Sequence, residues 1–284
     1  MTKRRSVGLR ILISNDDGIA AAGLRSLVMA CAAAGHRVDV VCPDQERSAA
    51  SHCLTTRQAV QVERVDEVFR SCATVWTCSG TPADAVKLAL TTLLREPPDL
   101  VLTGINHGPN LGCDVIYSGT VAAAMEGTTL LGIPAMAVSS GYTPGHSSGA
   151  ATPWVLAVVR HCLAKGWPPG VLLNMNLPDC PASRIRGVQW CRPCGRRHVD
   201  HFQVQPSTGG GGRYRLVVEM TAEDSRHRVG PAPWPTDLAC VQDGWIAVTP
   251  LQPQLFWHGD PSTLPPLAQL PIPSNEGVAA TRGQ

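Results

Sequence analysis

The feature that most constrains the fold is the regular alternation of short apolar runs with helical segments over residues 9–140. Short apolar runs bounded by turn residues are typical of buried strands, and apolar residues three or four positions apart are typical of helices. The expected strands are GLRILIS (8–14), HRVDVVCP (36–43), TVWTC (74–78), PDLVLTGIN (98–106) and IPAMAVSS (133–140). Strands that alternate with helices in this way predict an α/β fold, with helices covering both faces of a mostly parallel sheet.

Capping residues set the helix boundaries within this region. Gly35 is expected to end the helix that follows the first strand. Thr81 provides an N-cap for a later helix, Pro82 occupies its first position and Asp84 lies in its first turn. Ser118 begins the helix SGTVAAAMEGTTLLG. These signals fix where the strands end and the connecting segments begin.

The second half of the chain gives weaker signals. WVLAVVRHCLAKG (154–166) is typical of a helix and GVLLNMNLP (170–178) of a strand. RYRLVVEM (213–220) and DGWIAVTPL (243–251) are expected to be strands of a separate antiparallel element. The sequence that follows is rich in proline and has no sustained period, which is typical of a loosely ordered tail.

We therefore predict a single α/β domain over residues 9–250, preceded by a flexible N-terminus (1–8) and followed by the tail (251–284). Within the domain, the regular core spans residues 9–140, and an irregular or antiparallel extension spans residues 141–250. The length and the hydrophobic content of 44% are sufficient to bury a large core.

The composition argues against some classes of partner. Charged residues make up only 16% of the chain and the formal net charge is +2, so neither nucleic acid nor a membrane is expected as a partner. The sequence has no apolar run of the roughly eighteen residues that span a membrane, and no recognisable secretory signal. We expect a cytoplasmic protein in which the eleven cysteines are reduced thiols.

Polar residues gather at the predicted carboxyl ends of the strands, which is where ligands bind in an open parallel sheet. Asp16 and Asp17 directly follow the first strand. Further oxygen atoms and backbone N–H groups come from segments that follow other strands, at Ser48, Ser51, Asn106, Asn110, Ser118, Gly119 and Thr120. Adjacent carboxylates repel each other unless a positive charge lies between them. Oxygen ligands suit a hard divalent cation, and the helix start at Ser118 suits a phosphate, a combination typical of phosphoester hydrolysis.

Each of these residues also has a simpler interpretation. The NDDG segment before a helix is an ordinary turn and cap in many proteins. Asn106 and Asn110, which lie near glycines, can be turn residues, and Ser118 can be an N-cap with no further role. Their joint placement at successive strand ends favours a binding site over isolated turns.

A possible zinc site is the less favoured interpretation of a cysteine pair. Cys191 and Cys194 form a CxxC motif, with Cys180 and His198 nearby in the sequence. A second pair at the spacing of a zinc ribbon or finger is missing from the sequence.

Five motifs occur in an order that resembles the SurE family, the stationary-phase survival proteins that act as 5'/3'-nucleotidases. They are ILISNDDGI, ERSAAS, SGTPAD, TGINHGPNLG and DVIYSGTVAAAMEG. The resemblance is dense over residues 9–140, and LLNMNLPD and TDLACVQDGWIAVTPLQ are similar to later family segments. The chain departs from the usual family pattern at Ala49, where glycine is usual, and at Ala22, where proline is usual.

The resemblance implies a Rossmann-like three-layer core, one divalent cation (Mg²⁺ or Mn²⁺), and hydrolysis of nucleoside 5'-monophosphates to nucleoside and phosphate. Cleavage of 3'-monophosphates or short polyphosphate is a further family activity. Family metal ligands correspond to Asp16, Asp17, Ser48 and Asn106, and the carboxylates and Asn106 are also implied as catalytic. Family phosphate-site residues correspond to Asn110, Ser118, Gly119 and Thr120. Members form homodimers or homotetramers through the second half.

Two other functions were weighed against a nucleotidase. An oxidoreductase that binds a dinucleotide needs GxGxxG between the first strand and helix, whereas this chain has SNDDGIAAAG, whose carboxylates would repel a pyrophosphate. A non-catalytic, metal-gated nucleotide-binding protein would need the same ligands as the enzyme. The sequence leaves that second alternative open.

Overall fold

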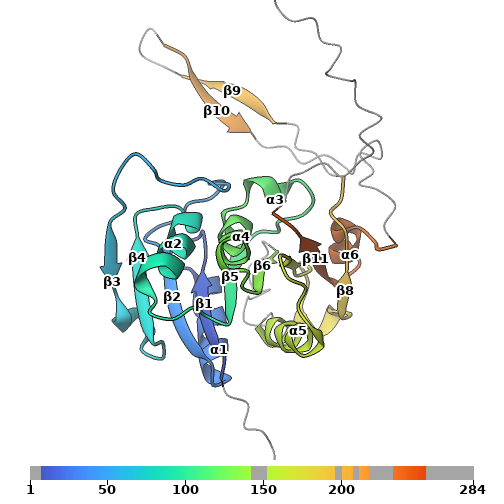
Figure 1. The fold of residues 1–284 in the computed structure, drawn as a ribbon. Coiled ribbons are helices and arrows are strands. Elements are labelled where there is room, and N and C mark those ends of the chain that lie inside the picture. The colour runs from blue at the N-terminus through green and yellow to red at the C-terminus, as the bar shows by residue number, and fades with distance from the viewer. Residues whose placement is uncertain (1–7, 142–151, 196–199, 207–210, 218–232, 254–284) are drawn as a thin grey trace, which may run out of the picture. The chain divides into compact units, whose positions relative to one another are not determined.

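The computed structural model describes residues 8–141, 152–195, 200–206, 211–217 and 233–253 (Figure 1). The chain divides into two units, residues 1–253 and residues 254–284. The second unit lies outside the described residues, and so does nearly all of the expected tail. The predicted domain limits therefore stay predictions.

The first unit is built on a nine-stranded sheet with the order β3-β4-β2-β1-β5-β6-β7-β11-β8. The six strands from β4 to β7 in this order all run parallel to their neighbours. They are β4 (Thr74–Cys78), β2 (Arg37–Pro43), β1 (Arg10–Ser14), β5 (Leu100–His107), β6 (Ala135–Ser140) and β7 (Leu172–Asn176). The mostly parallel sheet expected from the sequence is confirmed.

The two ends of the sheet carry the strands that break this pattern. Strand β3 (Val62–Arg64) pairs antiparallel with β4 at one edge. At the other edge, β11 (Ile246–Leu251) pairs antiparallel with β7, and β8 (Val188–Trp190) pairs parallel with β11. These edge strands were not assigned to the sheet from the sequence.

Helices cover both faces of the sheet (Figure 1). Helices α1 (Ala22–Ala33) and α5 (Thr152–Lys165) share one apolar cluster with the sheet. Helices α2 (Pro82–Leu88) and α4 (Gly119–Leu131) share the cluster on the other face, and a π-helical turn (Ala89–Leu93) extends α2. The remaining helical elements are α3 (Asp114–Tyr117), α6 (Asp237–Gln242) and two 3₁₀ turns (Asp66–Phe69 and Ala182–Arg184).

The continuous apolar character of the central strands explains this burial. In β1, Ile11 and Ile13 enter the cluster under α1 and α5, whereas Leu12 enters the cluster under α2 and α4. All three side chains are fully buried. A strand that is covered on both faces needs apolar residues at successive positions, which is why these strands lack an alternating pattern.

The helix signals read from the sequence form the expected caps. Thr81 Oγ1 accepts a hydrogen bond from the backbone N–H of Asp84 at 3.1 Å, and the Asp84 carboxylate accepts one from the Thr81 N–H at 2.9 Å. Pro82 follows the cap, and Gly35 adopts φ +82° after α1. These are a capping box and a glycine helix end, as predicted.

The segment 243–251 differs from the prediction, because its strand β11 belongs to the central sheet. It lies between β7 and β8, and Ile246, Ala247 and Val248 are buried. The sequence shows an apolar run typical of a strand, but it does not show which strand is its partner. That choice depends on β7, which lies some 70 residues away and has a free edge where β11 can pair.

Within the predicted strand at 213–220, residues 213–217 form a separate antiparallel element, and residues 218–220 lie outside the described residues. Strand β10 (Arg213–Val217) pairs with β9 (His201–Gln205) in a two-stranded sheet. The register places Leu216 opposite Phe202 and Tyr214 opposite Val204, so these four apolar residues share one face. Their exposed fractions are 47%, 68%, 63% and 69% in the order named. An isolated hairpin with an exposed apolar face is at best marginally stable in water.

Two further findings concern the membrane and the thiols. In the described part of the chain, none of the helices has the length and apolar content needed to span a membrane. All eleven cysteines lie in that part and are free thiols. The expectation of reduced cysteines agrees with this finding.

The strand order creates a switch point at one position. The chain passes from β1 to β2 on one side, and β5 later occupies the other side of β1. Connections on the two sides of such a switch point leave in opposite directions, and open α/β sheets bind ligands at this position, here the carboxyl ends of β1 and β5. Asp16 and Asp17 follow β1 directly, and Asn106 lies near the end of β5.

Candidate active site

Asp16 is held at the start of α4. Only 4% of its surface is exposed. Its Oδ2 accepts a hydrogen bond from the Thr120 N–H at 3.1 Å, and its Oδ1 accepts one from the Thr120 hydroxyl. Because Thr120 lies in the first turn of α4, the carboxylate faces the positive end of the helix dipole. The structure thus brings the predicted metal ligand Asp16 next to the predicted phosphate segment.

Both adjacent carboxylates hold their protons more tightly than usual. Burial raises the pKa of Asp16 to about 6, and although the hydrogen bonds from Thr120 oppose this change, the charge of Asp17 adds to it. Burial also raises the pKa of Asp17, which accepts a hydrogen bond from the His107 N–H at 3.1 Å. Two carboxylates in such a site ionise readily only if positive charge is brought between them.

Asn106 lies beside Asp17 at the end of β5. The backbone N–H of the next residue, His107, is the donor to Asp17. The Asn106 Nδ2 donates to Gly108 O at 2.8 Å, and the Ser140 hydroxyl donates to Asn106 O at 3.2 Å. Because an amide NH₂ group is only a donor, the side-chain oxygen is the Asn106 atom suited to a cation, and the contact with Gly108 orients the amide.

Ser48 lies on an exposed loop after β2, next to a residue that contacts Asp16. The Arg47 N–H donates to Asp16 O at 2.7 Å. The Ser48 hydroxyl itself donates to Glu46 Oε1 at 2.6 Å. The loop is therefore joined to the Asp16 backbone, while the Ser48 side chain is engaged within the loop.

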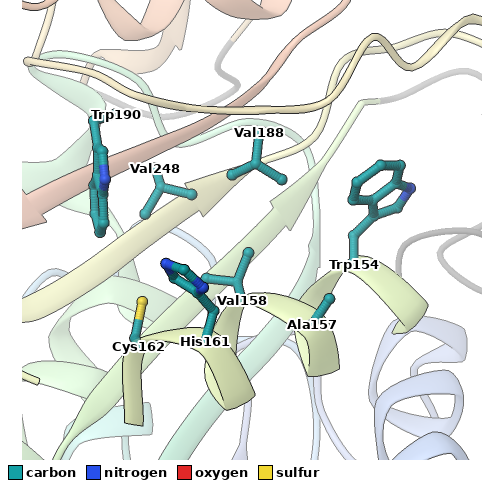
Figure 2. A pocket seen from close by; sticks show the side chains of 8 residues that line it. All are labelled: Trp154, Ala157, Val158, His161, Cys162, Val188, Trp190 and Val248. Carbon is teal, nitrogen blue, oxygen red and sulfur yellow. The ribbon is translucent and has the colours of Figure 1, made fainter. Parts of the chain in front are cut away.

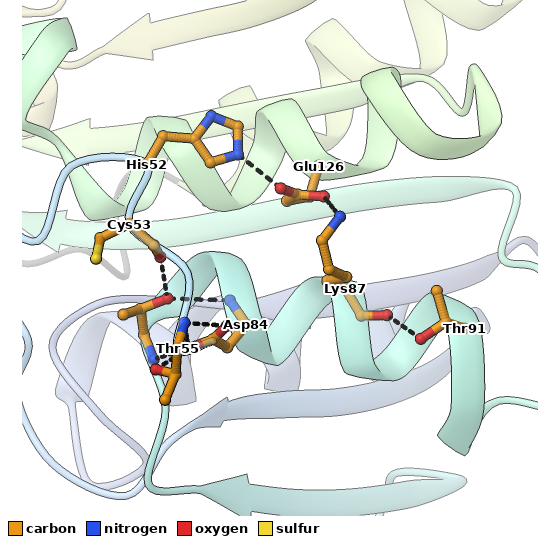
Figure 3. Close-up of polar contacts among 8 residues, drawn as sticks. His52, Cys53, Thr55, Asp84, Lys87, Thr91 and Glu126 are labelled. Atoms are coloured by element: carbon orange, nitrogen blue, oxygen red, sulfur yellow. Dashed lines mark hydrogen bonds and ion pairs between the residues drawn. The ribbon is translucent and has the colours of Figure 1, made fainter. Parts of the chain in front are cut away.

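A network of polar contacts joins this loop to α2 and α4 (Figure 3). His52 Nε2 lies 2.7 Å from one carboxylate oxygen of Glu126, and Lys87 Nζ lies 2.9 Å from the other. Burial acts to raise the pKa of Glu126, but the hydrogen bonds from His52 and Lys87 hold it below its usual value. The Thr55 hydroxyl and N–H donate to Asp84. No local pattern indicates His52 and Glu126 as partners, because they lie 74 residues apart.

Ser118 caps α4, as its simpler interpretation predicted. Its hydroxyl accepts a hydrogen bond from the Val121 N–H at 3.1 Å. Gly119 is fully packed against Asp16, because a Cβ at this position would lie 2.9 Å from Asp16 Cβ and 3.0 Å from Asp16 Oδ2. The absence of a side chain at Gly119 therefore permits the close approach of β1 to the helix start.

Asn110 lies deeper than the other predicted residues. Its N–H donates to Asn176 Oδ1 and its Nδ2 donates to Ser139 Oγ, both at 2.8 Å. Its carbonyl oxygen accepts from Asn174 Nδ2 at 2.8 Å and from Asn176 Nδ2 at 3.0 Å. These contacts hold the loop after β5 against β6 and β7. Asn174 and Asn176 belong to LLNMNLPD, a segment that the sequence resemblance included without giving it a role.

The donor set fits a hard divalent cation. Asp16, Asp17, Ser48 and Asn106 offer oxygen atoms only, which suits Mg²⁺ or Mn²⁺ better than zinc. Within the described ranges, no group of three or more His, Cys, Asp or Glu side chains is arranged to hold a metal. That result agrees with a ligand set in which only two members are carboxylates. It also gives no support to zinc at the CxxC pair, although His198 lies outside the described residues.

An apolar cavity lies away from the predicted site (Figure 2). It has a volume of about 360 Å³ and lies between α5 and strands β8 and β11. It is lined by Trp154, Ala157, Val158, His161, Cys162, Val188, Trp190 and Val248. None of these residues carries a carboxylate or belongs to the predicted site, so the cavity lacks the groups needed for phosphoester chemistry.

Comparison with known proteins agrees with this geometry. The model of the family described as "Survival protein SurE" matches residues 11–200. The chain belongs to the SurE family. A relative named 5'-nucleotidase SurE from Synechococcus sp. (strain RCC307) is 51% identical over 275 residues, which cover 97% of this chain and 98% of the relative. A relative of the same name from Prochlorococcus marinus (strain AS9601) is 46% identical and covers 90% of this chain and 95% of its own length.

A solved structure of a SurE protein has the same fold. The crystal structure of the SurE protein from Aquifex aeolicus is 34% identical in sequence, with a TM-score of 0.70. The match covers 87% of this chain and 94% of the Aquifex chain. The three-layer α/β fold expected from the SurE resemblance is therefore confirmed.

The structure shows the backbone cost of one departure from the usual SurE pattern. Ala49, where the family usually has glycine, adopts φ +56° in the loop that carries Ser48. This left-handed conformation costs an L-residue about 1–2 kcal/mol, whereas glycine adopts it freely. Ser51, two residues later, has φ +53°. Its N–H donates to Tyr117 O, which helps to hold the loop in this conformation beside Ser118.

The raised pKa of Asp16 predicts a specific pH dependence of stability without metal. A proton bound more tightly in the folded state stabilises it below the unfolded pKa of 3.8, and this stabilisation is lost as the pH passes the folded value of about 6. The difference of roughly two pKa units corresponds to about 3 kcal/mol.

We therefore expect the free energy of unfolding of wild type, measured relative to Asp16→Asn in EDTA, to fall by about 2 kcal/mol between about pH 4 and pH 7, with the rest of the change below pH 4. Urea titrations of both proteins at each pH measure this difference. Subtracting the free energy of unfolding of the variant from that of wild type removes the contribution of other titratable groups, such as Glu126. A difference that stays constant with pH would contradict the prediction.

Proposed function

We propose that this SurE protein is a divalent-metal-dependent phosphatase that hydrolyses nucleoside 5'-monophosphates to nucleoside and phosphate. The observation that carries the proposal is the pair of acidic residues at the switch point of the sheet. Asp16 is buried against the start of α4 and Asp17 lies beside Asn106, so carboxylates and a helix N-terminus meet at one edge of the sheet. The names of the relatives, 5'-nucleotidase SurE, support the same reaction.

In this proposal Asp16, Asp17, Ser48 and Asn106 hold one cation, Mg²⁺ or Mn²⁺. When bound, the cation lowers the pKa of a water molecule and neutralises charge on the phosphoryl oxygens. The charge of the cation favours the ionised forms of Asp16 and Asp17 and so offsets the cost of burying them. Asn106 orients its side-chain oxygen through the contact with Gly108.

The phosphate group is proposed to lie beside the start of α4, against Ser118, Gly119 and Thr120. The helix dipole favours an anion at this end. Asn110 completes the set, and its buried contacts with Asn174 and Asn176 give the loop a fixed backbone. Nucleoside 3'-monophosphates and short polyphosphate carry the same phosphoryl group, so we include them as secondary substrates.

The decisive experiment measures phosphate release from AMP with and without a divalent cation. We expect turnover with added Mg²⁺ or Mn²⁺, and none after treatment with EDTA, because all the proposed ligands are oxygen donors. Readdition of the cation should restore activity. Undiminished turnover in a metal-free preparation would contradict the mechanism. Metal-dependent binding of AMP without phosphate release would favour the non-catalytic nucleotide-binding alternative.

Asp17→Asn is expected to show whether Asp17 binds the metal or only forms a turn. The change keeps the shape of the side chain, and Oδ1 of asparagine can still accept the His107 N–H. Loss of one ligand charge should lower kcat by about a hundredfold, equivalent to about 3 kcal/mol. In EDTA the variant should be at least as stable as wild type, because the repulsion from Asp16 is removed. Steady-state kinetics and thermal melts in EDTA measure the two effects.

Asp99→Asn provides a matched control for this variant. Asp99 also accepts one backbone N–H, from Arg10 at 2.7 Å, but at the opposite end of β1. Its replacement should leave kcat unchanged. A destabilised Asp17→Asn protein that still hydrolyses AMP normally when folded would mean that the aspartates only form a turn.

We also propose a homodimer or homotetramer in which the exposed face of the β9–β10 hairpin packs against another subunit. Phe202 and Leu216 are cross-strand neighbours on this face. Replacing both with aspartate should lower the mass measured by light scattering at micromolar concentration, because charges cannot be buried in an apolar contact. Gln203→Asp, on the other face, should leave the mass unchanged. A wild-type monomer would contradict the proposal.

A further inference from the structure

A single segment of chain connects the two halves of the proposed site. Residues 107–117 begin after the proposed metal ligand Asn106 and end before Ser118 of the proposed phosphate segment. The segment contains a loop (107–113) followed by α3. Its position therefore contributes to the distance between Asn106 and the phosphate segment, in addition to the direct contact of Thr120 with Asp16. Residues of the second half of the chain bond to this loop at Asn110 and Gly112.

Asp237, the first residue of α6, contacts the loop directly. Its surface is fully buried. Its Oδ2 accepts a hydrogen bond from the Gly112 N–H at 2.9 Å. Its Oδ1 accepts hydrogen bonds from the N–H groups of Cys194 and Leu238, both at 2.8 Å. One carboxylate thus joins the loop, the turn after β8 and the start of α6.

The local packing leaves little freedom at this contact. Gly112 has φ +55°, and a Cβ there would lie 2.5 Å from Cys194 Sγ and 2.7 Å from Cys194 O. The loop backbone therefore lies directly against the turn that Asp237 holds. Two residues earlier, Asn110 is held by Asn174 and Asn176 from β7. The loop is fixed at two neighbouring points, from α6 and from β7.

A charged carboxylate suits the Asp237 position better than its amide would. Asp237 accepts from three backbone N–H groups through two oxygens, and an ionised carboxylate has acceptor positions only. An asparagine here has one acceptor oxygen and one NH₂ group. If its oxygen keeps the contacts with Cys194 and Leu238, its NH₂ group faces the Gly112 N–H, and the contact with the loop is lost.

We propose that Asp237 is a positioning residue for the phosphatase reaction, which fixes the backbone at Gly112 and thereby the position of the loop between the metal ligand Asn106 and the phosphate segment. The inference rests on the proposed function for its catalytic consequence. The inference gives a role to the segment TDLACVQDGWIAVTPLQ, which contributes no residue to the site predicted from the sequence. Asp237 acts through the loop and contacts neither the proposed metal ligands nor residues 118–120 in the described interactions.

The test compares Asp237→Asn with Asp243→Asn in the full-length protein. Asp243 is exposed at the end of the same helix, so its replacement makes the same chemical change away from the loop. Hydrogen–deuterium exchange reports the loop without needing activity, and kcat/KM for AMP with Mn²⁺ reports the reaction. The folded fraction of each protein is measured by circular dichroism, and the kinetic values are corrected for it.

For Asp237→Asn we expect amide exchange to be about tenfold faster at residues 108–114, with little change in β1 or β5, because one hydrogen bond to a buried N–H is lost. We expect kcat/KM per folded molecule to fall by about tenfold, which corresponds to about 1.4 kcal/mol. The Mn²⁺ concentration that gives half of the metal-induced thermal stabilisation should change by less than about threefold, because Asp16 and Asp17 are untouched. Asp243→Asn should match wild type in every measurement.

Gly112→Ala tests the same contact from the other side and remains informative if Asp237→Asn fails to fold. Its Cβ would press against Cys194, so the loop must move while the Asp237 carboxylate is retained. We expect the same local exchange and the same fall in kcat/KM. For either variant, unchanged exchange at residues 108–114, or faster exchange there with unaltered kcat/KM per folded molecule, would overturn the proposal.

The same experiment distinguishes failure of this inference from failure of the proposed function. If wild type releases no phosphate from AMP with Mn²⁺, the phosphatase proposal fails, and with it the catalytic consequence of Asp237. If wild type is active and Asp237→Asn is equally active per folded molecule, the phosphatase proposal stands and Asp237 is a structural residue only.

Discussion

The contact between Asp16 and Thr120 is the interaction on which the rest of the site depends. It joins the end of β1 to the start of α4 across 104 residues of sequence. The two hydrogen bonds compensate part of the cost of burying a carboxylate, yet burial still raises its pKa to about 6. Burial therefore still disfavours the charged form of Asp16, and a nearby cation would offset this effect. Gly119 permits this contact because a side chain there would collide with Asp16.

The site is formed by loops, and each loop is held by contacts from outside the site. His52 and Thr55 join the Ser48 loop to Glu126 on α4 and Asp84 on α2. Asp237 and Asn176 hold the loop that follows β5. Exposed loops fluctuate unless their backbones are bonded to rigid elements, and these contacts restrict such movement at the proposed site. The C-terminal half of the chain therefore contributes to the site without supplying a proposed ligand.

The sequence was sufficient for features that local spacing encodes. The continuous apolar run of β1 predicts a strand buried on both faces, and Thr81 with Asp84 predicts a helix start, because each signal involves residues within a few positions of one another. The parallel sheet follows from the alternation of such elements. Asp16, Asp17 and Asn106 were then expected at one edge because carboxyl ends of parallel strands share that edge. Ordered motifs added Ser48, Asn110 and the segment 118–120 through a resemblance to the SurE family.

The sequence by itself thus determined the main elements of the core over residues 9–140, the resemblance to the family and the candidate residues of the site. Only the tertiary structure decided which distant groups meet. Examples are the insertion of β11 between β7 and β8, the cap role of Ser118 beside the buried Asp16, and the contact of Asp237 with Gly112 across 125 residues. The physical reason is that a hydrogen bond or a strand pairing requires only proximity in space. No periodicity along the chain records a partner that folding brings near from another element.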